Sequence, residues 1–368
     1  MKKIITSESV NIGHPDKTCD VIADAFLDEA LSQDEKSQMA VECAIKNNKL
    51  FIYGEATTTA KIDYEKIARQ VLKDIGYEND FNVYQEISVQ SPDINQAVCK
   101  EELGANDQGI VFGYATNETS EFMPLPTVLA HKLMMEYEKF RKTNNNYFAD
   151  AKSQVSVLYE NDIPVKITNI LISVSHKENI NNEQIFNEIQ ENVVKNVLNG
   201  YQNYISSDIN VLINPSGRFT VWGSFGDSGC VGRKIVVDNY GGFGRVGGGC
   251  FSSKNATKVD RSGAYYARFV AKNIVALNLA DRCEIGVSYA IGKNHPISRY
   301  IETFGTNKVE VEFIEKFVDK YFNFSVQNMI NELGLLNPIY KNTACYGHFG
   351  RNEFSWEKIK YIETNISL

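Results

Sequence analysis

The residues Gly13-His-Pro-Asp-Lys17 place an imidazole, a carboxylate and an ammonium close together at the start of an expected helix. Pro15 suits the first turn of a helix, and Asp16 suits the positive end of its dipole. His14 and Lys17 are poorly placed at that end unless an anion lies beside them, because cations are disfavoured there. The segment therefore fits either an ordinary capped helix start or a site for a phosphate and its Mg²⁺.

Glycine is concentrated between residues 216 and 262. Within this stretch, residues 242–247 match the G-x-G-x-x-G fingerprint of dinucleotide-binding proteins, and they follow Lys234-Ile-Val-Val-Asp238, an apolar run that we expect to be a strand. The fingerprint requires a helix directly after the glycines, whereas the next helical pattern begins near Ser262. A dinucleotide-dependent oxidoreductase is therefore a weak alternative.

The glycine-rich stretch also carries many basic residues, and this combination predicts an anion site. Backbone N–H groups of glycine-rich turns can cradle phosphate, especially with cations on both sides. A Walker arrangement is disfavoured, because residues 226–234 have the wrong glycine spacing and no hydroxyl residue after their lysine. The flanking cations are Arg233, Lys234, Arg245, Lys254 and Lys258. We therefore expect a phosphate loop of unusual type.

Carboxylates in the expected strands and loops could bind a metal ion or a substrate. Asp150 and Lys152 open a strand and share one of its faces. Glu42 lies in the middle of a strand and Glu55 at the end of its partner strand. A carboxylate there is costly unless it faces solvent, is paired or binds a cation. Three more lie in polar or glycine-rich loops, where aspartate commonly forms turns: Asp107, Asp227 and Asp260.

These residues must be positioned by an order of elements that occurs twice. A hairpin is followed by a helix and then by a strand, first at 39–55, 64–75 and 82–89 and again at 153–175, 183–198 and 210–213. A third, less regular round runs through 234–238, 262–279 and 283–291. Strands joined by tight turns are antiparallel, so the pattern predicts an α+β protein and argues against a doubly wound parallel sheet.

The length, net charge and cysteine content of the chain narrow the class of protein further. The chain has 368 residues and a net charge of −8, so we expect no nucleic acid as a partner. Its seven cysteines form no C-x-x-C pair, which argues against a disulfide framework or a zinc ribbon. We find no signal peptide and no apolar run of about 20 residues, and we therefore expect a cytoplasmic protein without a membrane span.

Together, these stretches resemble the S-adenosylmethionine synthetase (methionine adenosyltransferase) family. The resemblance rests on TSESVNIGHPDK at 6–17, GANDQGIVFGYA at 104–115, DAKSQV at 150–155, SGRFTVWGSFGDSGCVGRKIVVDNYGG at 216–242 and YGHFGR at 346–351. It extends from about Lys3 to Ile359. It implies three similar α+β domains related by a pseudo-threefold axis, with mostly antiparallel sheets that carry helices on one face.

The resemblance further implies domain boundaries, an assembly and a reaction. The domains would cover residues 1–100, 103–221 and 222–368, with the chain interweaving between them. A homodimer, or a dimer of dimers forming a homotetramer, would hold its active sites between subunits. The implied reaction, part of one-carbon metabolism, joins ATP and L-methionine and uses water to give S-adenosylmethionine, phosphate and pyrophosphate. Two Mg²⁺ and one K⁺ per site are the implied cofactors.

The implied chemistry explains the residue types. The methionine sulfur is a neutral thioether, which attacks the 5′ carbon of ATP without losing a proton. The triphosphate gains negative charge as it leaves, so preorganised cations and metal ions are the natural catalysts. This accounts for a sequence that supplies lysines and arginines and has no Ser-His-Asp set.

The resemblance assigns roles to residues at matching positions. His14 would hydrogen-bond the leaving oxygen, and the other expected catalytic residues are Lys17, Lys152, Arg233, Lys234, Lys254 and Lys258. The ATP contacts would be His14, Asp150, Lys152, Arg218, Phe219, Asp227, Arg233, Lys234, Cys250 and Lys254. The methionine contacts would be Glu55, Gln90, Asp107, Asp227 and Lys258. Asp16 and Asp260 would bind Mg²⁺, and Glu42 would bind K⁺.

Some positions depart from the family pattern. Ile12 stands where members usually have glutamate, Cys250 where they usually have alanine, and Ser253-Lys-Asn-Ala256 where they usually have Gly-Lys-Asp-Pro. Residues 90–100 match the mobile loop that gates the site. Because every charged residue to which the resemblance assigns a role is retained, a catalytically silent regulatory member is the disfavoured alternative.

Overall fold

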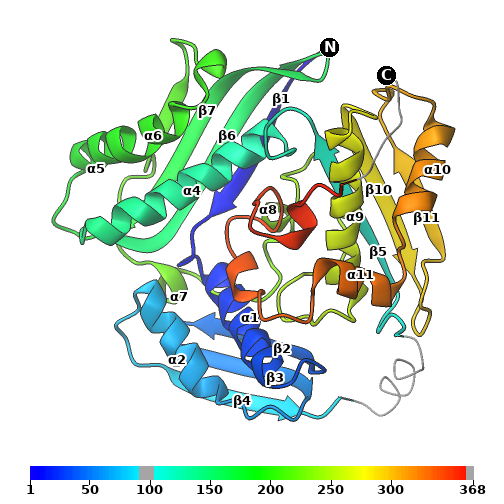
Figure 1. The fold of residues 1–368 in the computed structure, drawn as a ribbon. Helices are drawn as coiled ribbons and strands as arrows, with labels where there is room; N and C mark the ends of the chain where they lie inside the picture. Colours follow the sequence, from blue (N-terminus) through cyan, green and yellow to red (C-terminus); the bar gives the residue numbers. More distant parts are fainter. Residues whose placement is uncertain (91–102, 362–368) are drawn as a thin grey trace.

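The computed structural model describes residues 1–90 and 103–361, which form three β-sheets with helices packed against them (Figure 1). The first sheet consists, in spatial order, of β1 (Lys2–Val10), β6 (Tyr147–Glu160), β7 (Ile163–His176) and β8 (Asn210–Ile213). Helix α4 (Leu125–Thr143) packs against β1 and β6. The other helical segments of this part are α5 (Asn182–Ile189), a π-helix (Gln190–Val194) and α6 (Lys195–Leu198).

The second sheet has the order β4 (Asn82–Ser88), β3 (Lys49–Thr57), β2 (Gln38–Lys46) and β9 (Gly229–Cys230). In β2, every second residue is buried, beginning with Met39. This is the alternation of a sheet with one covered face. Helices α1 (Pro15–Gln33) and α2 (Tyr64–Ile75) lie over that face (Figure 1). Helix α2 ends at Gly76, whose φ of 116° places it in the region that glycine tolerates best.

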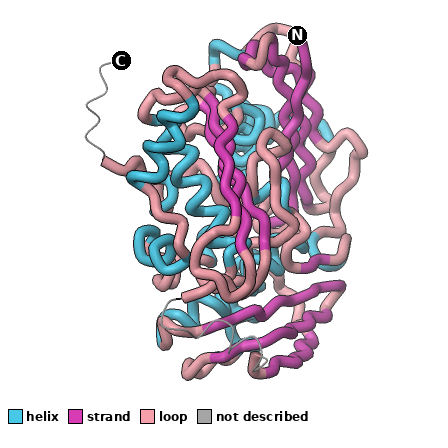
Figure 2. Tube along the Cα trace, turned by 90° about the vertical axis from the view of Figure 1, so that its right-hand side faces the viewer, coloured by secondary structure: helices cyan, strands magenta, loops and turns pink. Residues whose placement is uncertain are grey.

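The third sheet has the order β11 (Ser298–Glu302), β10 (Arg282–Tyr289) and β5 (Gly109–Thr116), and α9 (Val259–Ala276) packs against β5 and β10. The remaining helices of the described residues are α7 (Gly223–Gly226), α8 (Ile235–Asp238), α10 (Val311–Tyr321) and α11 (Val326–Leu333). Short 3₁₀ turns cover Gln202–Tyr204, Lys341–Thr343 and Ser355–Glu357. The strands of the second sheet run across those of the other two (Figure 2).

The α+β prediction is confirmed, and antiparallel pairings dominate the three sheets. Both expected rounds of hairpin, helix and strand are present, as β2–β3–α2–β4 and as β6–β7–α5 to α6–β8. Two of the sheets are not purely antiparallel, because β4 is parallel to β3 and β8 is parallel to β7. A helix that crosses over a sheet returns the chain in its original direction, which explains both parallel pairs.

The prediction of a strand at 234–238 is wrong, because these residues form the single helical turn α8 and its N-cap. Val237 is buried whereas Val236 is 47% exposed, so only part of the apolar run faces the interior. An apolar run this short does not by itself distinguish a strand from a buried helical turn. The next helix, α9, begins at Val259 rather than directly after Gly247, so the dinucleotide fingerprint lacks both its strand and its helix.

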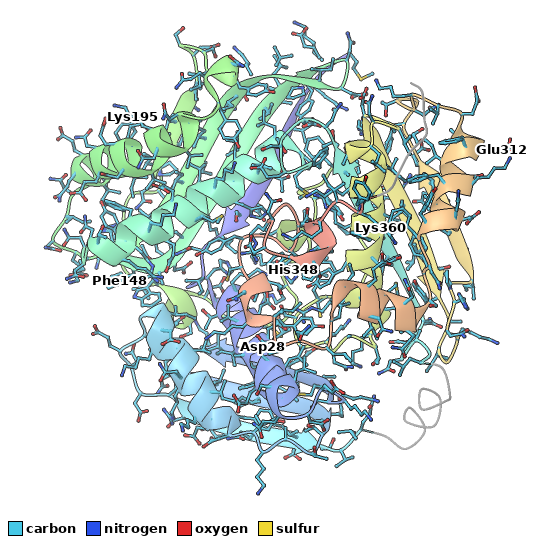
Figure 3. The ribbon with its side chains drawn as sticks, viewed as in Figure 1. Asp28, Phe148, Lys195, Glu312, His348 and Lys360 are labelled. Atoms are coloured by element: carbon cyan, nitrogen blue, oxygen red, sulfur yellow. The ribbon has the colours of Figure 1, made fainter. Side chains whose placement is uncertain are left out.

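Distant parts of the chain share sheets. Strand β1 pairs with β6, β5 pairs with β10, and β9 pairs with β2. Helix α1 is buried along most of its length, and His348 from the C-terminal segment lies in the middle of the molecule, whereas Lys195 and Glu312 mark its outer edges (Figure 3). Across the described residues, no helix combines the length and apolarity that crossing a membrane requires.

Candidate active site

His14 is the N-cap of α1, and its ring is held by the helix that it caps. Nδ1 accepts a hydrogen bond from the backbone N–H of Asp16 at 3.2 Å, and the side chain is only 3% exposed. Burial, together with the charges of Lys234 and Lys152, lowers the pKa of His14 to about 3. The ring is therefore neutral at pH 7, and because Nδ1 is an acceptor, the proton resides on Nε2. None of the described residues accepts a hydrogen bond from this Nε2–H.

Three aspartates on α1 fasten the glycine-rich segment to the helix. Asp16, Asp20 and Asp24 follow one another at intervals of four residues and so lie on one face. Each accepts a backbone N–H from that segment, at 3.0 Å from Cys230, 2.9 Å from Gly232 and 3.0 Å from Ser253, respectively. We call these residues the aspartate stripe. It fixes the course of the segment that carries the expected phosphate-binding cations.

Glycine permits this close approach. A Cβ at Gly229 would lie 2.1 Å from the carbonyl oxygen of Pro15, and φ of Gly232 is 77°. Cβ atoms do not tolerate the first distance, and side chains other than glycine rarely adopt the second conformation. The segment can therefore reach the start of α1 only with glycine at these positions.

Asp16 is enclosed by cations from the same segment. Lys234 Nζ lies 2.6 Å from its Oδ2, and Arg233 Nε lies 3.5 Å from its Oδ1. The side chain of Arg233 is 53% exposed, whereas that of Lys234 is 16% exposed. Arg233 and Lys234 thus stand beside the expected Mg²⁺ carboxylate, with His14 at the same helix start.

Lys17 differs from its expected place among phosphate-facing cations. Its ammonium is fully buried, donates to Asp20 Oδ2 at 2.9 Å and also pairs with Asp238. Burial opposes the charge on Lys17, but the two aspartates raise its pKa above the ordinary value. Because both carboxylates are already bound to this ammonium, Lys17 is placed to hold α8 against α1 rather than to face an open site.

Asp150 and Lys152 lie near His14, as do the charges of Lys234 and Asp227. Asp150 Oδ2 accepts the N–H of Gly223 at 2.9 Å, while its buried Oδ1 has no partner in the described part of the chain. Burial raises the pKa of Asp150 to about 6, against the opposing charge of Lys152. These residues and the start of α1 form one group, which we call the His14 group.

A second group surrounds Lys258 at the N-cap of α9. Burial and the charge of Lys254 lower the pKa of Lys258, whereas Asp107, Glu55 and Asp260 act in the opposite direction. Lys254 Nζ lies 2.6 Å from Asp260 Oδ2. We call this the Lys258 group.

Glu42 and Cys250 also belong to the Lys258 group. Glu42 is half-buried on β2, and burial raises its pKa against the charges of Lys254 and Lys258. Burial also raises the pKa of Cys250 to about 11, so its thiol is uncharged at neutral pH. Cys250 packs against Gly232, where an added Cβ would meet the Cys250 sulfur at 2.8 Å.

Three further expected contacts are Arg218, Phe219 and Gln90. Arg218 is exposed and pairs with Glu178, and the backbone of Phe219 exchanges hydrogen bonds with His176 at 2.9 and 3.1 Å. Gln90 is buried, and its Oε1 has no partner among the described residues. The rest of the expected gating loop, 91–100, lies outside the described residues.

The two carboxylates expected to bind Mg²⁺ are held by lysines. In residues 1–90 and 103–361, no three His, Cys, Asp or Glu side chains are arranged to hold a metal ion. Asp16 and Asp260 are each bound to a lysine instead. A single carboxylate with phosphate oxygens and water is nevertheless a usual environment for Mg²⁺, so both residues fit that ion.

Sequence reasoning missed several residues that organise this site. Asp20 and Asp24 carry a detectable signal, since they continue the four-residue spacing of Asp16 along an expected helix. Asp238 carries no such signal, because its partner Lys17 lies 221 positions away in the sequence. Only the folded chain brings this pair together.

The chain matches sequence models of three domains of S-adenosylmethionine synthetase: the N-terminal domain at residues 2–100, the central domain at 102–219 and the C-terminal domain at 221–358. It is 48% identical to the S-adenosylmethionine synthase of Mesoplasma florum, over 99% of both chains. It is 48% identical to that of Mycoplasma capricolum subsp. capricolum and 47% identical to that of Mycoplasma mycoides subsp. mycoides, in each case over 98% of this chain and 96% of the relative. The resemblance is confirmed across nearly the whole sequence, and the chain belongs to the S-adenosylmethionine synthetase family, the methionine adenosyltransferases.

Proposed function

We propose that the chain makes S-adenosylmethionine by direct attack of the methionine sulfur on the 5′ carbon of ATP. The observation that carries this proposal is the state of His14, a neutral ring whose Nε2–H donates to none of the described residues. A donor fixed in the field of Lys152 and Lys234 suits a leaving oxygen that gains negative charge. A charged acid is not needed, because the triphosphate leaves as an anion.

The electron balance of the step requires no base. A sulfur lone pair forms the new C–S bond, and the electrons of the C5′–O bond leave with the triphosphate. The sulfur becomes a sulfonium, which a nearby carboxylate stabilises. We propose that this carboxylate belongs to the methionine side of the site, formed by Glu55, Gln90, Asp107, Asp227 and Lys258. Water then splits the triphosphate into phosphate and pyrophosphate.

We propose two Mg²⁺ and one K⁺ per site, with Asp16 and Asp260 as Mg²⁺ ligands and Glu42 as the K⁺ ligand. Bound Mg²⁺ would offset the negative charge of the polyphosphate. Lys234 and Lys254, which form ion pairs with the two aspartates, would then pair with phosphate oxygens instead. Arg233 would contribute a further cation at the His14 group.

We further propose that a homodimer, or a dimer of dimers, completes the site by placing the His14 group of one chain against the Lys258 group of another. The distribution of the two Mg²⁺ carboxylates supports this arrangement. Asp16 lies in the first group and Asp260 in the second, and each is neutralised by a lysine of its own group. ATP and methionine as substrates favour a cytoplasmic enzyme.

The test is a product assay on the purified chain with ATP, Mg²⁺ and K⁺, with and without methionine. We expect S-adenosylmethionine, phosphate and pyrophosphate in equal amounts, and all three only when methionine is present. Phosphate released at the same rate without methionine would indicate a plain ATPase and contradict the proposal. No turnover at all would favour the silent regulatory member.

A further inference from the structure

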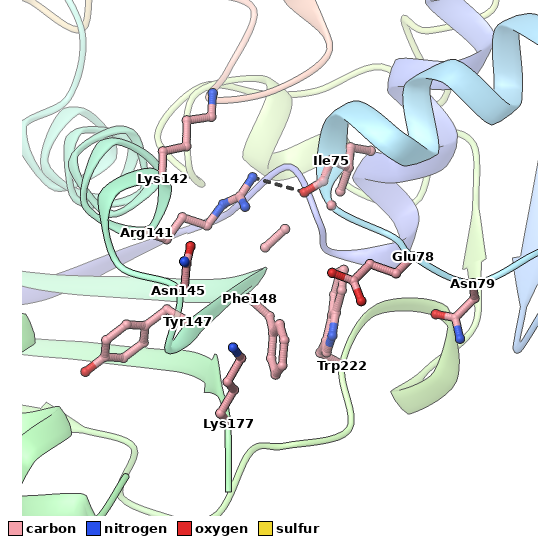
Figure 4. A pocket seen from close by; sticks show the side chains of 12 residues that line it. Ile75, Glu78, Asn79, Arg141, Lys142, Asn145, Tyr147, Phe148, Lys177 and Trp222 are labelled. Atoms are coloured by element: carbon pink, nitrogen blue, oxygen red, sulfur yellow. Dashed lines mark hydrogen bonds between the residues drawn. The ribbon is translucent and has the colours of Figure 1, made fainter. Parts of the chain in front are cut away.

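A hollow outside both charged groups lies between the ends of α2 and α4. Its volume is about 540 Å³, and its lining comes from the ends of both helices, the start of β6, Lys177 and Trp222 (Figure 4). This volume lies within the range of small-molecule sites, which is roughly 300 to 1,000 Å³. We call it the α2–α4 hollow.

Two aromatic rings of the lining, Trp222 and Phe148, belong to a stack of three rings, and the third ring, Tyr77, lies behind the lining. Trp222 lies between Tyr77, at a centroid distance of 4.6 Å, and Phe148, at 5.5 Å, with interplanar angles of 28° and 12°. Trp222 therefore stacks with both neighbouring rings. Phe148 stacks with no other ring in the described part of the chain, so the stack ends there with one face of Phe148 unpaired. A flat ring can extend the stack at that face.

The charges beside this stack favour an anion. Lys177 is exposed and has no ionic partner among the described residues, and in Figure 4 Phe148 lies between Trp222 and Lys177. Arg141 donates hydrogen bonds from Nε and Nη2 to the Glu138 carboxylate, at 2.6 and 2.7 Å. Its Nη2 also donates to the Ile75 carbonyl at 3.1 Å. Its Nη1 donates to no residue in 1–90 or 103–361. Glu78 is the carboxylate in the lining.

We propose that the α2–α4 hollow is a second ligand site, which takes a small planar aromatic anion. The ring of the ligand lies on the free face of Phe148, and its carboxylate or phosphate pairs with Lys177. Ring stacking and a charge pair together select against both a bare anion and a neutral ring, because each of these makes only one of the two contacts.

The stack also connects the hollow to the His14 group. Asp150 follows Phe148 by two residues on β6 and accepts the N–H of Gly223, the residue after Trp222. Tyr77 Oη accepts the N–H of Ser224 at 3.0 Å, so the opposite end of the stack holds the same backbone. A ligand that shifts the stack must move the partners of Asp150. We therefore expect occupancy of the hollow to change the affinity for ATP, a consequence that rests on the proposed function.

Trp222 provides the readout, because Trp356, the other of the two tryptophans, is fully buried and serves as a constant background. Three probes are compared. Nicotinate is a flat ring with a carboxylate, nicotinamide is the matched neutral ring, and inorganic phosphate is an anion without a ring. We expect saturable quenching by nicotinate, with a Kd at least tenfold lower than for either of the others. Trp222→Phe should abolish the signal. No saturable change, or equal Kd values for nicotinate and nicotinamide, overturns the site.

Variants of exposed lysines separate the site from general charge effects. Lys177→Ala should raise the Kd for nicotinate about tenfold and leave that for nicotinamide unchanged, while Lys195→Ala, at the outer edge of the molecule, changes neither (Figure 3). An equal effect of both variants contradicts the proposal. The KM for ATP should change at least twofold with saturating nicotinate in the parent chain and not in Lys177→Ala. If nicotinate binds but the KM for ATP does not change, the ligand site stands and its link to Asp150 is refuted. If the chain has no activity, the result counts only against the proposed function.

Discussion

Lys234 Nζ lies 2.6 Å from Asp16 Oδ2, so the carboxylate expected to bind Mg²⁺ is neutralised by a lysine from the glycine-rich segment. Its other oxygen accepts the N–H of Cys230 at 3.0 Å. One carboxylate thus holds both the backbone and a side chain of that segment against the start of α1. We expect an incoming metal–phosphate pair to replace this contact, with the metal on Asp16 and the phosphate on Lys234.

The neutral ring of His14 makes a specific prediction for its removal. His14→Ala should lower kcat by about 100- to 1,000-fold, the usual loss for one preorganised donor at a developing oxyanion. It should cost only about 1 kcal/mol of stability through loss of the helix cap. Steady-state kinetics and urea unfolding measure the two effects.

The matched control is His14→Asn, which can still accept the N–H of Asp16 but has a shorter side chain. It should recover stability without recovering turnover. If His14→Ala turns over within twofold of the parent chain, His14 has no part in the leaving-group step.

Lys17 should matter chiefly for stability. Lys17→Met leaves the carboxylates of Asp20 and Asp238 buried without their ammonium, and removing one partner of a buried pair costs about 3 to 5 kcal/mol. Urea unfolding measures this loss, and Lys142→Met, at a lysine whose side chain is 63% exposed, should change stability little. A Lys17→Met chain with unchanged stability and lost turnover would instead support the direct phosphate contact that the sequence suggests.

Local patterns were enough to predict much of the fold. The alternation in β2 and β3 identifies a hairpin, and the spacing of apolar residues identifies α2 and its end at Gly76. The start of α1 and the glycine-rich segment also predict an anion site, and this stays a prediction. These features depend on residues close in sequence, whose periodicity can be read directly.

Long-range pairings could not be predicted in the same way. The parallel direction of β4 and β8 follows from how a helix crosses the sheet, and the pairing of β1 with β6 joins Lys2 to Glu160. The place of Lys17 depends on Asp238, which the sequence gives no reason to choose over other aspartates. Burial of an ion pair is a property of the packed interior rather than of either residue.

The raised pKa of Asp150 predicts a pH-dependent stability. Folding raises this pKa from 3.8 to about 6, so between these values the native chain binds more protons than the unfolded chain. Stability therefore falls as pH rises through this window, and the full penalty applies above about pH 6. Asp150→Asn should be more stable at pH 7.5, by at most about 3 kcal/mol, since one pKa unit corresponds to about 1.4 kcal/mol.

The comparison of Asp150→Asn with the parent chain is made by urea unfolding at several pH values. The difference in the free energy of unfolding should shrink as the pH is lowered toward 4. A difference that stays constant across this range would show that titration of Asp150 does not contribute. Turnover of the variant should fall even where its stability rises, because Asp150 is a proposed nucleotide contact.

Two adjacent glycines provide a matched test of the Lys258 group. A Cβ at Gly249 would lie 2.1 Å from Asp260 Oδ2 and 2.2 Å from its Cγ, whereas a Cβ at Gly248 would meet nothing within 4 Å. Gly249→Ala must therefore push the Asp260 carboxylate away from Lys254, which lies 2.6 Å from it. If Asp260 binds Mg²⁺, the Mg²⁺ concentration for half-maximal activity should rise at least tenfold in Gly249→Ala and stay unchanged in Gly248→Ala. Equal Mg²⁺ dependence in the two variants, with both folded by circular dichroism, would remove Asp260 from the metal site and leave its carboxylate as a partner of Lys254 alone.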